Sequence, residues 1–135
     1  MTIQINKFKG ISYELKIELK KHGFNNSDQV LEATRTPAGR QSVAESLGVD
    51  SRVVLELANR ADLARVNGIG GVFSDLLEQA GVDTVKELAT RRPDNLHAKL
   101  LEINFEKELA GRTPTLKAVQ DWVTQAGELS RMLEY

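Results

Sequence analysis

The sequence predicts an all-α protein made of two tandem repeats, each with four to five short helices, packed into one compact unit. Apolar residues recur at helical spacing, and two segments match each other at a constant offset along the chain. No segment alternates apolar and polar residues for long enough to predict a strand. With 135 residues and 41% hydrophobic content, the chain can bury a core without disulfides or a metal.

Each matching segment contains two glycines, and the separation between them is the same in both segments. Gly10 and Gly23 in the first segment correspond to Gly68 and Gly81 in the second. We expect each segment to open its repeat with a glycine-containing helical hairpin. The chain therefore divides into residues 1–60 and 61–135, with the boundary inside a long helix at 50–66.

A capped helix is expected directly after each hairpin. Asn26 and Thr84 are residue types that accept hydrogen bonds from the free amides at a helix start. Gln29 and Glu87 follow three residues later, as a capping box requires.

Two further helices complete each repeat. Pro37 and Pro93 are placed to open the first of them, since proline is tolerated at the first helical position. Amphipathic helices at 50–66 and 115–125 then close the repeats. The second repeat carries an insertion at about 108–114, which we expect to be an exposed loop.

The composition excludes several classes of protein. The chain has no cysteine, so disulfide scaffolds, thiolate metal sites and cysteine nucleophiles are excluded. No apolar run approaches the roughly 18 residues that span a bilayer, and the N-terminal residues do not resemble a signal peptide. These features predict a cytoplasmic protein that does not enter a membrane.

Positive charge is concentrated at one end of the chain. The net charge is -1 and the isoelectric point about 6.1, which is unusual for a dedicated nucleic-acid coat. The segment 1–22 is nevertheless basic, with five lysines against two glutamates. These lysines could form a solvated helix face or contact a nucleic acid; they are Lys7, Lys9, Lys16, Lys20 and Lys21.

The second hairpin has the sequence of a tight helix reversal. Asn67 and Gly68 can adopt the positive φ that the reversal needs. Ile69 can pack as an apolar plug between the two helices. Gly70 and Gly71 leave the first amides of the next helix uncovered, and such amides bind anions, especially phosphate. The favoured interpretation is that the glycines serve only to allow a tight, closely packed reversal, with phosphate contact as the alternative.

The order apolar–x–Gly–Ile–Gly in residues 66–70 resembles the helix-hairpin-helix motif of DNA-handling proteins. That resemblance implies hairpin amides that hold backbone phosphates without reading sequence, in some members with a cation on hairpin carbonyls. Over residues 59–70 and 76–89 the chain resembles a bacterial tandem helix-hairpin-helix family catalogued as a domain of unknown function. The similarity extends over nearly the whole chain and implies the fold, but scarcely any activity.

The two hairpins differ in ways that bear on phosphate binding. In the first, Ser12 stands where the second hairpin has a second glycine, and its hydroxyl could cap the following helix. In the second, Asp75 and Glu78 follow the glycines, near where a phosphate backbone would run. The better backbone geometry and the better electrostatics thus fall in different repeats.

The remaining polar and aromatic residues predict structural roles. His22 and His97 are far apart and have no cysteine nearby, so no metal site is expected. Trp122 is expected in the core or between the repeats, with base stacking as the alternative. Arg65 and Arg131 precede apolar residues in similar tails, which indicates a structural role first and anion contact second.

The sequence supports two hypotheses about function, and neither is enzymatic. Nothing matches a metal-hydrolase, nucleophile-elbow or phosphate-loop pattern, and no cofactor is expected. The first hypothesis is a module that binds duplex DNA or another nucleic acid through its backbone phosphates. The alternative is a protein-interaction adaptor or self-associating scaffold. The candidate phosphate-binding residues are Gly68, Ile69, Gly70, Gly71, Gly10, Ser12, Lys7, Lys9, Lys16 and Lys20.

Overall fold

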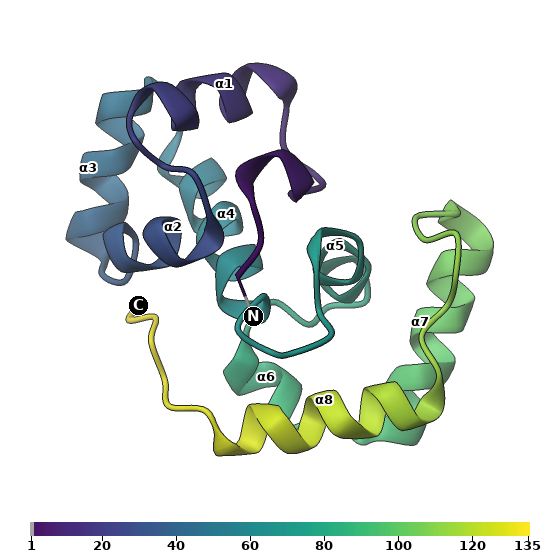
Figure 1. The fold of residues 1–135 in the computed structure, drawn as a ribbon. Coiled ribbons are helices and arrows are strands. Elements are labelled where there is room, and N and C mark those ends of the chain that lie inside the picture. Colours follow the sequence, from purple (N-terminus) through teal and green to yellow (C-terminus); the bar gives the residue numbers. More distant parts are fainter. Residues whose placement is uncertain (1) are drawn as a thin grey trace.

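Eight α-helices and one short 3-10 helix make up residues 2–135, the part of the chain that the computed structural model describes (Figure 1). In order they are η1 (Ile5–Lys7), α1 (Tyr13–Lys21), α2 (Ser27–Ala33), α3 (Pro37–Leu47), α4 (Ser51–Leu63), α5 (Gly71–Gln79), α6 (Val85–Ala89), α7 (Pro93–Lys107) and α8 (Leu116–Glu128). Within these residues the only strand-like pairing is an isolated bridge between Gln4 and Asn26. The prediction of an all-α protein is confirmed.

Side-chain caps begin the helices that follow the hairpins, as the sequence predicts. The Asn26 side chain accepts a hydrogen bond from Gln29 N at 3.0 Å, and Thr84 Oγ1 accepts one from Glu87 N at 3.3 Å. The return bond of the expected capping box differs: Gln29 Oε1 accepts from Asn25 N, the residue before the cap. The Glu87 carboxylate likewise accepts from the residue before its cap.

The long helix expected over residues 50–66 ends earlier, at Leu63 of α4. The amides of Arg65 and Val66 bond to carbonyls three residues back, both at 3.1 Å, so the chain tightens before the hairpin. The helix expected over residues 115–125 instead runs to Glu128 as α8, and its last turn buries Ala126.

The insertion between α7 and α8 is a loop, as expected, but it is not fully exposed. Asn104 holds it through two bonds, accepting from Ala110 N at 2.8 Å and donating to Ala110 O at 3.0 Å. Ala110 and Pro114 are buried, so the loop packs onto the protein while its tip stays in solvent.

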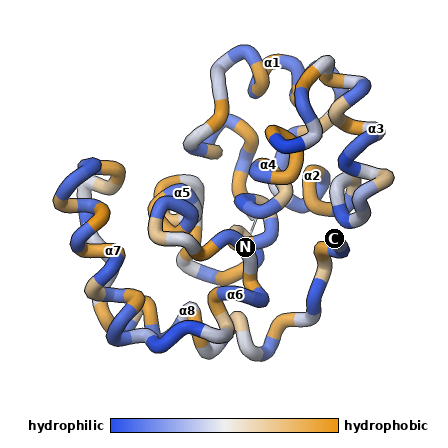
Figure 2. The backbone as a smooth tube through the Cα atoms, turned by 180° about the vertical axis from the view of Figure 1, so that it is seen from behind, coloured by the Kyte–Doolittle hydropathy of each residue, from blue (hydrophilic) through white to orange (hydrophobic). Residues whose placement is uncertain are grey.

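Buried apolar side chains form two clusters that meet at the end of α4. The first cluster draws mainly on residues between Ile3 and Ala64, and the second on residues between Leu63 and Ala126. Figure 2 shows hydrophobic and hydrophilic residues interspersed along the helices, as expected for elements buried on one face. Among residues 2–135, no helix is both long and apolar enough to cross a membrane.

The helices pack in the same order in both halves of the chain. Helices α2 and α3 lie against α4, and helices α6 and α7 lie against α8. Contacts between α4 and α5 join the two sets. The origin of this order in a tandem repeat stays a prediction.

The segment after α8, residues 129–135, returns to the first half of the chain and packs there (Figure 1). We call it the returning segment. Leu133 is buried in the first apolar cluster. Glu134 N donates to Arg35 O at 2.8 Å, and the Glu134 carbonyl accepts from Arg40 Nη2 at 2.6 Å. The Arg40 guanidinium also lies 5.6 Å from the centre of the Tyr135 ring, at cation–π distance. Burial raises the pKa of the Tyr135 hydroxyl above 10.0.

Candidate functional site at the hairpin junction

The reversal between α4 and α5 is tightly packed from beneath by α8. Gly68 has a φ of +99°, which favours glycine, and a Cβ there would lie 2.9 Å from Trp122 Nε1. Ile69 is fully buried in the second cluster. Trp122 is only 2% exposed, and its ring centre is 5.3 Å from that of Phe73. Trp122 therefore acts as core beneath the hairpin, which leaves it poorly placed to stack on a base.

The side chain of Gln125 fastens the tip of this hairpin. Its Oε1 accepts from Asn67 N at 2.8 Å, and its Nε2 donates to Asn67 O at 3.1 Å. The same Nε2 also donates to Asp121 Oδ2 at 2.9 Å, which fixes the orientation of the amide. One side chain thus satisfies both backbone groups of the residue before Gly68.

We expect Gln125→Ala to lower the free energy of unfolding by about 1 kcal/mol, because its two hydrogen bonds to the hairpin and its bond to Asp121 are lost at a partly exposed site. Urea unfolding followed by circular dichroism measures the change. Gln120→Ala, an exposed position on the same helix, is the matched control and should have little effect. Equal losses in both variants would show that Gln125 does not hold the hairpin.

The start of α5 lies against the backbone of the first hairpin. Gly70 is the N-cap and has no side-chain cap bond, while Gly71 is buried. A Cβ on Gly71 would overlap the carbonyl group of Lys7 and would touch the Cα of Phe8. The absence of a side chain at Gly71 is therefore needed for the two hairpins to touch.

Arg60 of α4 joins the two hairpins through a buried guanidinium. Its Nε donates to Lys9 O in the first hairpin at 2.8 Å, and its Nη2 donates to Asp75 Oδ1 of α5 at 2.8 Å. Its Nη1 pairs with Glu78 Oε2, one turn further along α5. The Arg60 side chain is only 4% exposed, so this network is screened from water. A Cβ on Gly10, where φ is +78°, would overlap the guanidinium.

The carboxylates of Asp75 and Glu78 are thereby directed into the protein. The sequence alone placed them beside a candidate phosphate path, where they would repel DNA. Their side chains are 11% and 20% exposed, and both pair with the single guanidinium between the hairpins, which offsets one of the two negative charges. Their role in this structure is to hold the two halves together.

The candidate residues of the first hairpin are mostly exposed. Lys7, Lys9 and Lys20 are exposed, and Lys16 is half-buried with its Nζ donating to Asn6 O at 3.3 Å. Ser12 caps α1, as expected, by accepting from Leu15 N at 3.1 Å. The structure thus brings the backbone of the lysine-bearing hairpin against the glycines of the second hairpin.

A family model described as Domain of unknown function (DUF4332) matches residues 9–129. The chain belongs to this family. The predicted resemblance to a domain of unknown function is confirmed to that extent. In this DUF4332 member the matched region includes Arg60 and both carboxylates that it binds. No curated protein and no solved structure matches the chain.

A second buried pair ties α4 to α6 and to the returning segment of this DUF4332 chain. Asp62 Oδ2 accepts from Val85 N, the first amide of α6, at 2.9 Å. Asp62 Oδ1 pairs with Arg65 Nη1 at 2.9 Å, and Arg65 Nη2 donates to Ser130 O at 2.7 Å. Arg131 donates from Nε to Leu133 O at 2.9 Å. These bonds support the structural role expected for both arginines.

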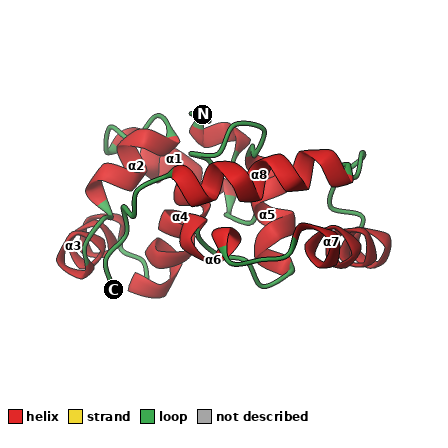
Figure 3. Cartoon of the chain, turned by 90° about the horizontal axis from the view of Figure 1, so that it is seen from below, coloured by secondary structure: helices red, strands yellow, loops and turns green. Residues whose placement is uncertain are grey.

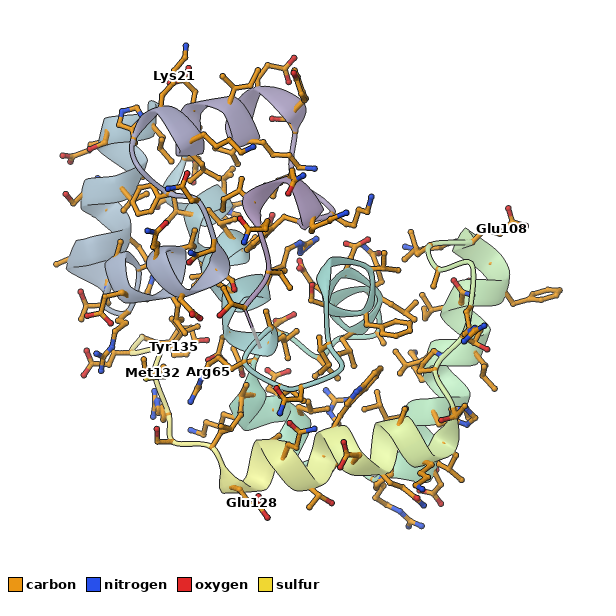
Figure 4. The ribbon with its side chains drawn as sticks, in the orientation of Figure 1. Lys21, Arg65, Glu108, Glu128, Met132 and Tyr135 are labelled. Carbon is orange, nitrogen blue, oxygen red and sulfur yellow. The ribbon has the colours of Figure 1, made fainter. Side chains whose placement is uncertain are left out.

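A pocket of about 320 Å³ lies where α6, α8 and the returning segment meet. Arg65, Met132 and Tyr135, which help to line it, are labelled close together in Figure 4.

The two histidines contact backbone carbonyl groups. His22 Nδ1 lies 2.8 Å from Glu18 O, and His97 Nε2 lies 3.0 Å from Pro114 O. No group of three metal-ligating side chains gathers in the described part of the chain.

Arg60 could have been singled out from the sequence as a charged residue on an apolar helix face. It follows Leu57 by three residues and adjoins Ala61, both of which are buried. A charge at such a position needs a buried partner. The partner itself could not be read off, because Lys9 and Asp75 lie 51 and 15 residues away in the chain.

Asp83, between α5 and α6, provides a pH-dependent test of this region. Burial raises the pKa of its carboxyl above 3.8, and the nearby Glu87 carboxylate adds to the rise. A raised folded-state pKa means that the stability from the protonated group is lost as pH rises through that pKa. We expect Asp83→Asn to be slightly more stable than the wild type at pH 7, with the difference shrinking toward about pH 4. Urea unfolding at both pH values measures it, and a constant difference would contradict the assignment.

Proposed function

We propose that the chain is a non-enzymatic protein-interaction scaffold of tandem helix-hairpin-helix type. The observation that supports this proposal is the Arg60 network, which packs the two hairpins against each other. A hairpin that binds phosphate needs open amides at the start of its second helix. Here that start lies against the backbone of Lys7 and Phe8. The hairpins therefore serve to join two helical sets into one body, whose outer helices remain available to a partner.

The near-neutral charge supports the same proposal. A net charge of -1 supplies no general attraction for a polyanion. Interaction surfaces between proteins instead rely on exposed aromatic and aliphatic side chains with a polar surround. Large apolar side chains of this kind are exposed on the outer helices, above all Phe105 of α7.

Site-specific photo-crosslinking in cells tests the proposal. A photoreactive amino acid is introduced at position 105 in one variant and at position 9 in another, because both positions are exposed. We expect protein adducts from position 105 that survive nuclease treatment. Nuclease-sensitive adducts at position 9, with no protein adduct at position 105, would overturn the scaffold proposal.

Weak binding of nucleic-acid backbone is the second candidate function. The observation that favours it is that Lys7, Lys9 and Lys20 stay exposed, while Asp75 and Glu78 are turned into the protein toward Arg60, which offsets part of their charge. The logarithm of the affinity for duplex DNA would then fall linearly with the logarithm of the salt concentration. The slope would be roughly proportional to the number of phosphates contacted. Fluorescence anisotropy at low salt measures the affinity for duplex DNA. We expect Lys7→Gln/Lys9→Gln to weaken binding more than the control variant Lys86→Gln/Lys117→Gln. Undetectable binding at low salt, or equal loss in both variants, would rule it out.

A further inference from the structure

Two outer helices each expose a pair of large apolar side chains on one face. On α1 the pair is Tyr13 and Ile17, which are 73% and 37% exposed. On α7 the pair is Leu101 and Phe105, which are 38% and 87% exposed. Each pair is separated by four residues, so its members are neighbours on the helix surface. Both faces lack a partner within residues 2–135.

The two faces have surrounds of opposite charge. Lys20 and Lys21 accompany the α1 pair, in the basic segment 1–22 where lysines outnumber glutamates. On α7, Glu102 and Glu106 each follow an apolar residue of the pair by one position, about 100° around the helix, so they border the pair on one flank, and Glu108 lies just beyond the helix. All five of these charged residues are exposed.

Other charges near the two faces reduce this contrast without reversing it. On α1, Glu14 and Glu18 are present, and Glu18 lies 3.5 Å from Lys21. On α7, Lys99 is exposed, and Lys107 keeps its positive charge while its Nζ donates to Gln79 Oε1 of α5 at 2.7 Å. The α1 end remains basic and the stretch from 101 to 108 remains acidic.

The two faces belong to different halves of the molecule and do not meet within one chain. Figures 1 and 3 place α1 with α2 and α3, while α7 lies at the far end beside α8. In Figure 4, Lys21 at the end of α1 and Glu108 at the end of α7 lie on opposite sides. Complementary faces that cannot meet within one copy can meet between two.

We propose that the α1 face of one chain binds the α7 face of a second copy, an inference that rests on the proposed scaffold function and names its partner. Tyr13 and Ile17 pack against Leu101 and Phe105, and the lysines of one face lie beside the glutamates of the other. Because the faces differ, the contact is heterologous and leaves a free face at each end. The assembly therefore grows into chains or closes into rings.

The contact is small and is expected to be weak. Four apolar side chains bury much less than the roughly 800 Å² per partner of a standard interface. The opposite charges raise the association rate and make the affinity sensitive to salt. Association of the purified chain should accordingly appear only at high concentration, from about 10 µM to about 1 mM.

Sedimentation velocity over that concentration range tests the proposal. We expect concentration-dependent association at low salt that weakens as salt is added. Phe105→Ser should raise the dissociation constant about tenfold or more, since exposed aromatic anchors dominate such contacts. Circular dichroism confirms that the variant stays folded, because Phe105 is almost fully exposed in the monomer.

Charge reversal provides the specific control. Glu102→Lys/Glu106→Lys and Lys20→Glu/Lys21→Glu should each abolish self-association, because each gives a chain two faces of the same sign. Mixing the two variants should restore it, since the unchanged α1 face of one variant then finds the unchanged α7 face of the other. Glu45→Lys/Glu128→Lys changes the same net charge at exposed positions elsewhere and should have no effect. The proposal would be overturned if both charge-reversal variants self-associated as the wild type does, or if mixing them did not restore association.

The crosslinking at position 105 separates failure of this inference from failure of the scaffold proposal. Adducts between copies of the chain support both. A nuclease-resistant adduct with a different protein, from a chain that stays monomeric at all concentrations, overturns self-association and leaves the scaffold function standing. A monomeric chain with no protein adduct overturns both.

Discussion

Replacing Arg60 by methionine is expected to lower the free energy of unfolding by about 3–5 kcal/mol. Methionine keeps most of the length of the side chain but leaves Asp75 and Glu78 facing each other without a cation. It also removes the donor to Lys9 O, which is 2.8 Å from Arg60 Nε. A domain of this size is stabilised by only about 5–15 kcal/mol, so the variant should be close to unfolding at room temperature. Urea denaturation followed by circular dichroism measures the loss.

Two controls show whether the loss comes from the buried network. Arg52→Met changes an exposed arginine on the same helix and should shift stability by no more than about 0.5 kcal/mol. Arg60→Met/Asp75→Asn/Glu78→Gln removes the unpaired charges and should regain a substantial part of the lost stability. If Arg60→Met costs no more than Arg52→Met, the guanidinium does not join the hairpins.

Gly71→Ala should cost about 3 kcal/mol, at the upper end for an added methyl group in a packed interior. The new Cβ would overlap the Lys7 carbonyl oxygen, which is a backbone atom and cannot rotate away. The first hairpin must then move off the start of α5, and this movement strains the bonds of Arg60. Thermal unfolding reports the loss as a lower melting temperature.

Gly127→Ala is the matched control for this substitution. Gly127 also lies in a helix, α8, but apart from its chain neighbours and the backbone of that helix no atom lies within 4 Å of its would-be Cβ. Alanine there should stabilise the protein by up to about 1 kcal/mol through helix propensity. A Gly71→Ala variant as stable as Gly127→Ala would mean that the two hairpins are not in close contact.

The features that the sequence predicts correctly are those decided within a few residues. Ser12, Asn26 and Thr84 cap helices because a hydroxyl or amide oxygen reaches an amide three residues on. Gly68 adopts a positive φ because the reversal is tight. The all-helical class follows from apolar periodicity, which is a local property as well.

The candidate site is different because distant residues decide it. The role of Gly71 depends on Lys7, and that of Asp75 on Arg60. From the charge pattern alone, Asp75 and Glu78 are expected to repel a phosphate backbone, whereas in the structure they pair with Arg60 between the hairpins. The apolar spacing also predicts a helix that continues to residue 66. Helix α4 ends at Leu63 instead, because the chain beyond it turns to reach the hairpin.

The returning segment 129–135 has a consequence for biosynthesis. Arg40 and Glu134 are 94 positions apart in the chain, yet they share a hydrogen bond of 2.6 Å. Leu133 occupies a place in the first apolar cluster, so that cluster is incomplete on a nascent chain that has not yet reached residue 133. We therefore expect the first half to gain its last native contacts only after the second half has been synthesised.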